Sequence, residues 1–247
     1  MNPTVHVEHC MGTVFTLDVR DPGDWQDAIG EAVAWLHQVD AVFSTYRPDS
    51  ELNRLGRREL RLADAHPELA LVLDLCAQLQ AETGGAFSAL SAGRVDPTGL
   101  VKGWAIERAS DLLRRHGSAN HAVNGGGDLQ LAGESAPGRP WRVGIAAPGP
   151  VGPVVAGRDF AVATSGTAER GAHILDPFTG RPAEGLFSAS VTGPSLTRAD
   201  AYATAAYVLG RDALHWIATL PGYSALLIWP DGRTEASAGW PAAVPAS

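Results

Sequence analysis

The 247-residue sequence has little cysteine and no long run of lysine or arginine. Its two cysteines, Cys10 and Cys76, cannot form the disulfide framework of a small secreted domain, and their spacing matches no zinc motif. The formal net charge of −8 would repel nucleic acid and an anionic membrane surface. We therefore expect neither as a partner, and we expect both cysteines to be buried as small apolar residues.

Long apolar stretches are also missing. No segment has the length and hydrophobicity of a membrane span, and the first ten residues lack the features of a signal peptide. These absences predict no membrane insertion and a cytoplasmic site of action. The 45% of apolar and 19% of charged residues are typical of a folded protein. We predict a single domain over residues 1–247, with a frayed tail from about residue 237 to 247, where alanine and proline dominate.

Hydrophobic periodicity gives a coarse view of the elements. It predicts helices over residues 25–43, 67–82, 101–116 and 198–209, and another from about residue 212. Alternating or short apolar patterns predict strands over residues 13–19, 122–123, 129–131, 141–145, 160–163 and 225–229, with a loop at 148–157. Because strands and helices are mixed without a regular βαβ rhythm, an α+β fold is favoured over a doubly wound sheet.

Two segments could bind an anion. The run Asn124-Gly125-Gly126-Gly127-Asp128 could cradle a phosphate with its backbone amides, or it could be a plain hairpin turn. The segment 96–104 places Lys102 at the start of a helix, where the helix dipole disfavours a cation. A bound phosphate would explain this lysine, and a solvated pair with Asp96 is the alternative. The sequence has no GxGxxG at a helix start and no Walker lysine motif, which excludes the common nucleotide-binding loops.

Three further segments carry chemistry. His173 stands at a predicted strand end, where it could act as an acid or base near neutral pH or be structural. The residues 163–166 bring two hydroxyls to another strand end, where loops commonly line sites, or they serve only for packing. Asp200 and Thr204 are four residues apart on a helix, so both could hold a hard cation through oxygen. Alternatively, Asp200 only completes a capping box that begins at Thr197.

In this order, the motifs resemble those of the FAD:protein FMN transferase family, the ApbE-like flavin transferases, over nearly the whole chain. Met11-Gly12-Thr13 resembles the opening of that family, residues 46–53 its YRPDSE-N signature, and residues 83–87 its TGGAFD turn. The segments 96–104, 124–128, 163–166, 173–180 and 200–204 follow in register. The resemblance implies a T-fold-like, two-lobed single domain of the α+β class, with mixed or antiparallel sheets and packed helices.

The resemblance also implies a flavin pocket and a metal site. The predicted cofactor-binding set combines residues that the resemblance implies with residues of the glycine-rich run and of the hydroxyl-bearing strand end. Its members are Met11, Tyr46, Ala86, Phe87, Ser88, Asp96, Lys102, Asn124, Gly125, Gly126, Ser165 and Ile174. The metal, Mg²⁺ or Mn²⁺, would be held by Gly99 through its carbonyl, Asp200, Ala203 and Thr204. The sequence departs from the family pattern at Ser88, where aspartate is usual, and at Thr167-Ala168, where an aromatic residue is common.

The implied reaction is the Mg²⁺-dependent transfer of the FMN half of FAD to a threonine or serine hydroxyl of an acceptor flavoprotein, with release of AMP. Its catalytic residues would be His173, Lys102 and Asp200. Lys102 and the metal would stabilise charge on the pyrophosphate, and His173 would accept or position the hydroxyl proton. The alternatives are a metal-dependent FAD pyrophosphatase, which gives FMN and AMP, and a flavin-binding protein without turnover.

Overall fold

The computed structural model describes residues 3–91, 93–167 and 174–242. Its central element is an eight-stranded sheet in the order β1-β2-β5-β6-β9-β10-β11-β12, in which neighbouring strands are antiparallel. The strands are β1 (Thr4–Cys10), β2 (Thr13–Val19), β5 (His121–Gly125), β6 (Asp128–Ala132), β9 (Ala161–Gly166), β10 (Ser188–Gly193), β11 (Ser224–Ile228) and β12 (Thr234–Ala236). This arrangement confirms the predicted α+β class.

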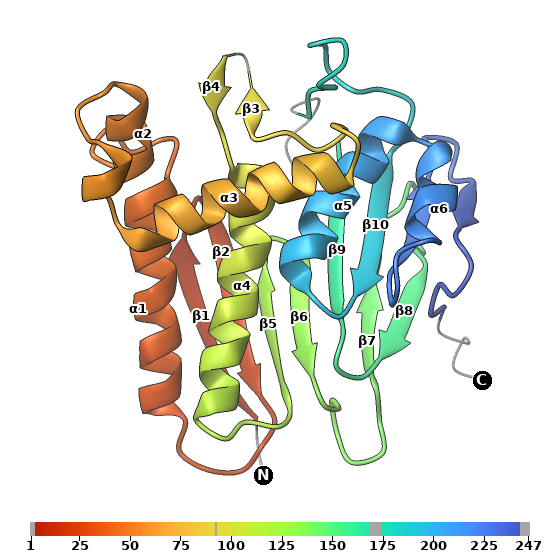
Figure 1. Cartoon of the computed structure of the whole chain (residues 1–247). Helices are drawn as coiled ribbons and strands as arrows, with labels where there is room; N and C mark the ends of the chain where they lie inside the picture. The colour runs from red at the N-terminus through yellow and green to blue at the C-terminus, as the bar shows by residue number, and fades with distance from the viewer. Residues whose placement is uncertain (1–2, 92, 168–173, 243–247) are drawn as a thin grey trace.

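The helices cover one face of this sheet (Figure 1). They are α1 (Gln26–Phe43), α2 (Glu51–Gly56), α3 (Pro67–Glu82), α4 (Thr98–Arg115), α5 (Leu196–Leu209) and α6 (Asp212–Ile217). The local sequence explains where several of them end: Pro67 suits the first turn of α3, and Gly84 and Gly117 take positive φ just after α3 and α4. The main hydrophobic core lies between the helices and the sheet and includes Cys10 and Cys76, as predicted.

A second, smaller core lies on the opposite face of the sheet. The hairpin of β7 (Trp141–Gly144) and β8 (Val154–Gly157) covers it, with Trp141, Val155 and Phe160 among its buried residues. The C-terminal segment contributes as well: Ser237 exchanges hydrogen bonds with Ala225 in β11, and the N–H of Ala156 donates to the carbonyl of Pro241. The predicted fraying therefore does not begin at residue 237, because these contacts hold residues 237–242. Residues 243–247 lie outside the described residues.

Most predicted elements are present, and the differences have physical causes. Helix α4 begins at Thr98 rather than near residue 101, because Asp96 accepts hydrogen bonds at its start. Strand β8 lies inside the predicted loop 148–157. Strand β10 is not among the predicted strands. All six of its residues are buried, so its small and polar residues do not show the alternation of a half-exposed strand. No helix in the described ranges is both long and apolar enough for a membrane span.

The fold gathers several turns at one end of the sheet, the upper end in Figure 1. The β1–β2 turn at Met11 and Gly12, the β5–β6 turn at Gly126 and Gly127, the beginning of α4 and the end of β9 all meet there. These are the segments that the sequence singled out for chemistry.

Candidate active site

A cavity of about 590 Å³ lies at this end of the sheet. Part of its wall is apolar and is formed by Met11, Phe43, Ala86, Phe87, Val101 and Ile174. Another part is polar and is formed by Lys102, Thr164, Ser165, Ser188, Asp200 and Thr204. Glycines at positions 99, 126, 127 and 144 also contribute to the lining. The volume is within the range of ligand sites, and the lining suits a ligand with a large flat apolar part and a charged part.

Lys102, the only lysine in the sequence, projects from the first turns of α4 into this cavity. Its Nζ lies 2.5 Å from Oδ2 of Asp128, a carboxylate that is only 1% exposed. The other oxygen of Asp128 accepts a hydrogen bond of 2.9 Å from the N–H of Thr164. The alternative of a solvated Lys102–Asp96 pair is therefore wrong, because Asp96 instead accepts from the N–H and hydroxyl of Thr98.

Asp200 lies in α5 and is 5% exposed. Its Oδ2 accepts a hydrogen bond of 2.9 Å from the N–H of Gly103. A Cβ at position 103 would stand 2.7 Å from the Cβ of Asp200, so glycine is required for this close approach of α4 and α5. Burial raises the pKa of Asp200 well above its usual range, and the charge of Asp128 raises it further, against the opposing effects of Lys102 and the Gly103 N–H.

The capping-box interpretation of Asp200 is wrong. Helix α5 begins at Leu196, and the hydroxyl of Ser195 accepts from the N–H of Arg198 as its N-cap. The N–H of Thr197 donates to Glu107 instead, at 2.7 Å. Asp200 thus lies beyond the first turn and lines the cavity.

Oxygen atoms gather beside Asp200. The hydroxyl of Thr204 lies 3.1 Å from that of Ser165, and a Cβ built on Gly99 would be 3.6 Å from the Thr204 hydroxyl. Ala203 is fully buried and is not part of the cavity lining. Within the described ranges, no three His, Cys, Asp or Glu side chains are grouped so that they could hold a metal ion. The donors available are one carboxylate, two hydroxyls and backbone carbonyls, which suit a hard cation that keeps several waters.

Met11 has an unusual backbone conformation. Its φ is 52° and that of Gly12 is 68°, as in a two-residue hairpin turn that normally prefers asparagine followed by glycine. Positive φ is unfavourable for methionine, yet its side chain lines the cavity. Such strain at a ligand-facing position suggests that the side chain is retained for contact with a ligand.

The glycine-rich run is divided between two roles. Gly126 and Gly127 have positive φ and line the cavity. Asn124 and Gly125, which are also predicted to bind the cofactor, are not among the residues that line the cavity. The side-chain oxygen of Asn124 accepts from the N–H of Gly127 at 3.1 Å, and a Cβ on Gly125 would stand 2.6 Å from the ring of Phe15. These two residues therefore shape the turn from outside the cavity.

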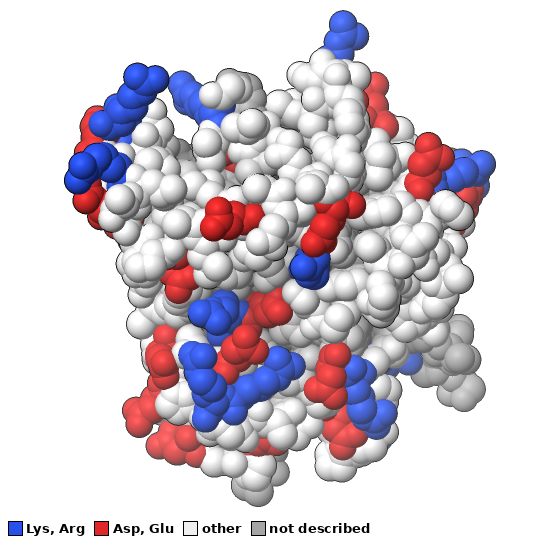
Figure 2. All heavy atoms as spheres, in the orientation of Figure 1, with Lys and Arg blue, Asp and Glu red and all other residues white. Residues whose placement is uncertain are grey.

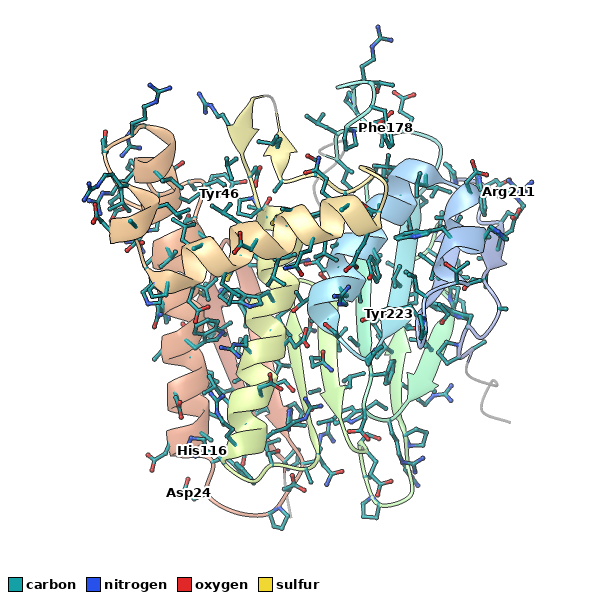
Figure 3. The ribbon with its side chains drawn as sticks, viewed as in Figure 1. Asp24, Tyr46, His116, Phe178, Arg211 and Tyr223 are labelled. Carbon is teal, nitrogen blue, oxygen red and sulfur yellow. The ribbon has the colours of Figure 1, made fainter. Side chains whose placement is uncertain are left out.

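The remaining predicted residues lie around the same space. Ala86, Phe87, Ser88, Asp96 and Ile174 line it, and Phe87 is held by a 3.0 Å hydrogen bond from its N–H to the hydroxyl of Thr83. Tyr46 also lines it but is 85% exposed, and Figure 3 places it toward the upper end of the molecule. His173 lies outside the described residues.

Several lining residues were not predicted from the sequence. Ser188, at the start of β10, is buried, and its hydroxyl has no hydrogen-bond partner among the described residues. Asp40 in α1 and residues 144–146 at the end of β7 also contribute. A buried hydroxyl without a partner is costly, so Ser188 indicates a polar ligand group at this wall.

The surface charges do not form a large basic patch on the face shown in Figure 2, where acidic and basic side chains are interspersed. Among the described residues that line the cavity, Lys102 is the one cationic side chain, and it would provide local positive charge for an anionic ligand.

Comparison with known proteins gives a consistent family match. The sequence model of the ApbE family matches residues 11–95 and 89–227. The chain is 35% identical to the FAD:protein FMN transferase of Rhodobacter capsulatus over 235 residues, which cover 90% of this chain and 42% of that protein. It is 36% identical to the protein of the same name from Treponema pallidum over 168 residues, which cover 59% of this chain and 46% of that protein. The matched stretches thus span less than half the length of these relatives.

Solved structures share the fold. The flavin transferase ApbE from Vibrio cholerae superimposes with a TM-score of 0.83 at 24% identity, over 96% of this chain and 97% of that one. The ApbE protein from Thermotoga maritima superimposes with a TM-score of 0.84 at 22% identity, also over 96% and 97% of the two chains.

Proposed function

The chain belongs to the ApbE family, and on that basis we propose that it transfers the FMN half of FAD to a hydroxyl group of an acceptor protein. The observation that carries the proposal is the composition of the cavity, in which an apolar wall adjoins Lys102 and the oxygen cluster of Asp200, Thr204 and Ser165. The apolar wall suits the isoalloxazine ring. The charged part suits the pyrophosphate.

A divalent cation fits the same cluster. Asp200 would hold it through its carboxylate, Thr204 through its hydroxyl and Gly99 through its carbonyl, with water and phosphate oxygens in the other positions. Within the part of the chain that the structure describes, the carboxylates of Asp128 and Asp200 both face the ammonium of Lys102, and this excess of negative charge favours binding of a cation. A bound Mg²⁺ would neutralise charge on the pyrophosphate oxygens. We do not expect Ala203 to contribute a side-chain ligand.

The residues then divide the chemistry among them. Met11, Phe87 and Ile174 would hold and orient the flavin, and Lys102 would face the oxygens of the phosphate that is attacked. The oxygen of the acceptor hydroxyl forms a bond to the FMN phosphorus, the bond from that phosphorus to the bridging oxygen breaks, and AMP leaves. His173, placed by the sequence beside Ile174, is proposed to take the hydroxyl proton.

The test is incubation of the purified chain with FAD, Mg²⁺ and candidate acceptor proteins. In-gel flavin fluorescence and mass spectrometry detect a flavinylated serine or threonine, and chromatography detects AMP and FMN. AMP together with a flavinylated protein supports the proposal. AMP with an equal amount of free FMN indicates a pyrophosphatase instead, and bound but unchanged FAD indicates a flavin-binding protein without turnover.

A further inference from the structure

We propose that Asp128 is a positioning residue that holds Lys102 toward the phosphate side of the cavity and keeps it from pairing with Asp200. This inference rests on the proposed function. It concerns a carboxylate that is absent from the cavity lining, and its Oδ2 lies 2.5 Å from the ammonium of Lys102, which does line the cavity.

Asp128 is itself firmly placed. It is the first residue of β6, it pairs with Gly125 across the hairpin, and its Oδ1 accepts from the N–H of Thr164 in the neighbouring strand β9. Its side chain is 1% exposed and that of Lys102 is 25% exposed, so solvent reaches the ion pair from the lysine side only. A flexible lysine is therefore tied to a carboxylate that two strands hold in position.

Asp200 is the competing partner for Lys102. Its carboxylate bonds to the N–H of Gly103, the residue that follows Lys102 in α4. Without the negative charge of Asp128, the ammonium of Lys102 would be drawn to Asp200, because a buried carboxylate and a nearby ammonium attract strongly. Such a pair would occupy both groups that the proposed reaction needs separately, the cation that faces phosphate and the carboxylate that holds a metal.

Asp128→Asn tests this most simply, because the amide oxygen can still accept from Thr164 while the charge is lost. We expect the kcat for AMP release to fall about 10–100-fold, as for other residues that orient a ligand group. The Mg²⁺ concentration for half-maximal activity should rise, whereas FAD affinity without metal should stay within a few-fold. A purely structural role would instead lower kcat, FAD affinity and melting temperature together. Asp128→Glu keeps the charge and should regain part of the activity.

A double-substitution cycle separates positioning from other roles. Lys102→Met should lower kcat about 10²–10³-fold through loss of charge stabilisation. If Asp128 acts through Lys102, then adding Asp128→Asn to Lys102→Met should cause little further loss. A further loss of tenfold or more in the double variant would overturn the proposal.

The lone lysine gives a readout that does not require activity. Protein labelled with ¹³C and ¹⁵N in lysine should show one side-chain signal, that of Lys102. We expect the signal to shift in Asp128→Asn but not in the control Asp159→Asn, whose carboxylate accepts from the backbone N–H of Gly133 at 2.8 Å. An unshifted signal in folded Asp128→Asn contradicts the proposal. Absence of AMP release by the wild type contradicts the proposed function. In that case the lysine signal still tests whether Asp128 holds Lys102 in place.

Discussion

Two aspartates at opposite ends of α4 show how the same side chain serves different purposes. Near the C-terminal end, Asp21 accepts hydrogen bonds from the N–H groups of Ala119 and Asn120, the amide of Asn120 and the hydroxyl of Ser118. Burial raises its pKa, but these hydrogen bonds outweigh burial and lower it below the usual range. Near the N-terminal end, Asp200 accepts from Gly103, and burial with the nearby Asp128 raises its pKa.

The difference separates a cluster whose hydrogen bonds are complete within the protein from one that a ligand could complete. Around Asp21, the acceptors are satisfied within the protein, and both ring nitrogens of the neighbouring His121 lie within 2.9 Å of serine hydroxyls. Among the described residues around Asp200, two carboxylates face the ammonium of Lys102, and the hydroxyl of Ser188, which lines the same cavity, has no hydrogen-bond partner. A ligand that brings a cation and polar atoms would complete the second cluster but could add nothing to the first.

The sharpest contrast is expected between Asp200→Asn and Asp21→Asn. Asp200→Asn removes an anionic ligand from the proposed cation site, so AMP release should fall by about 10³-fold or more and recover in part at high Mg²⁺. Its melting temperature should hold or rise, because a buried charge has been removed. Asp21→Asn should lower the melting temperature and leave the specific activity of the folded protein near that of the wild type. Equal activity losses in both variants would contradict the distinction between a structural role for Asp21 and a metal-binding role for Asp200.

His173→Ala tests the proposed transfer of the hydroxyl proton, whereas Asp200→Asn tests the proposed metal site. We expect AMP release to fall about 10²–10⁴-fold, the range for acid-base groups, while FAD affinity stays within a few-fold. Stopped assays of AMP and a fluorescence titration of FAD measure the two quantities. Full turnover by this variant would mean that the hydroxyl proton leaves by another route.

The hydrogen-bonded cluster around Asp21 and His121 is expected to make the stability of the protein depend on pH. Burial, aided by Arg114, lowers the pKa of His121 to about 4, below the ordinary value of 6.5. The unfolded chain therefore binds this proton first, and the free energy of unfolding should decrease as the pH falls from 6.5 toward 4, by about 3 kcal/mol in all. Urea denaturation at pH 7 and pH 5 measures the decrease. His121→Gln should show a smaller change over the same interval, and an identical change would point to other groups.

The smallest effect is expected at the β1–β2 turn. Met11→Asn places a residue that tolerates positive φ at a strained position, so the protein should gain about 1 kcal/mol in unfolding free energy. FAD should bind more weakly, because the methionine side chain leaves the apolar wall. A variant that is no more stable would contradict backbone strain at Met11. A variant that binds FAD as before would contradict contact between the Met11 side chain and the ligand.

The sequence was most informative where local signals act. Pro67 and Gly84 mark the ends of α3, and Lys102, Asp200 and Thr204, which the sequence predicts for the site, line one cavity. Long-range choices were not predictable in this way. Whether Lys102 pairs with Asp96 or Asp128 depends on how the β5–β6 hairpin lies against α4.

The choice of helix cap was equally ambiguous. Ser195 and Thr197 both have side chains that could cap α5. In the structure the hydroxyl of Ser195 accepts from the N–H of Arg198, whereas the N–H and hydroxyl of Thr197 donate to Glu107 in α4. Strand β10 lacked a signal because burial of every residue removes the alternation that marks a half-exposed strand.

The central claim is that the cavity binds FAD through a cation held at Asp200. Titration of the wild-type protein with FAD and with FMN, each with and without Mg²⁺, tests it most directly by flavin fluorescence. We expect Mg²⁺ to tighten FAD binding about tenfold or more, to change FMN binding much less, and to lose its effect in Asp200→Asn. Equal affinity for FAD with and without Mg²⁺, or equal affinity for FAD and FMN, would contradict a site built around the pyrophosphate.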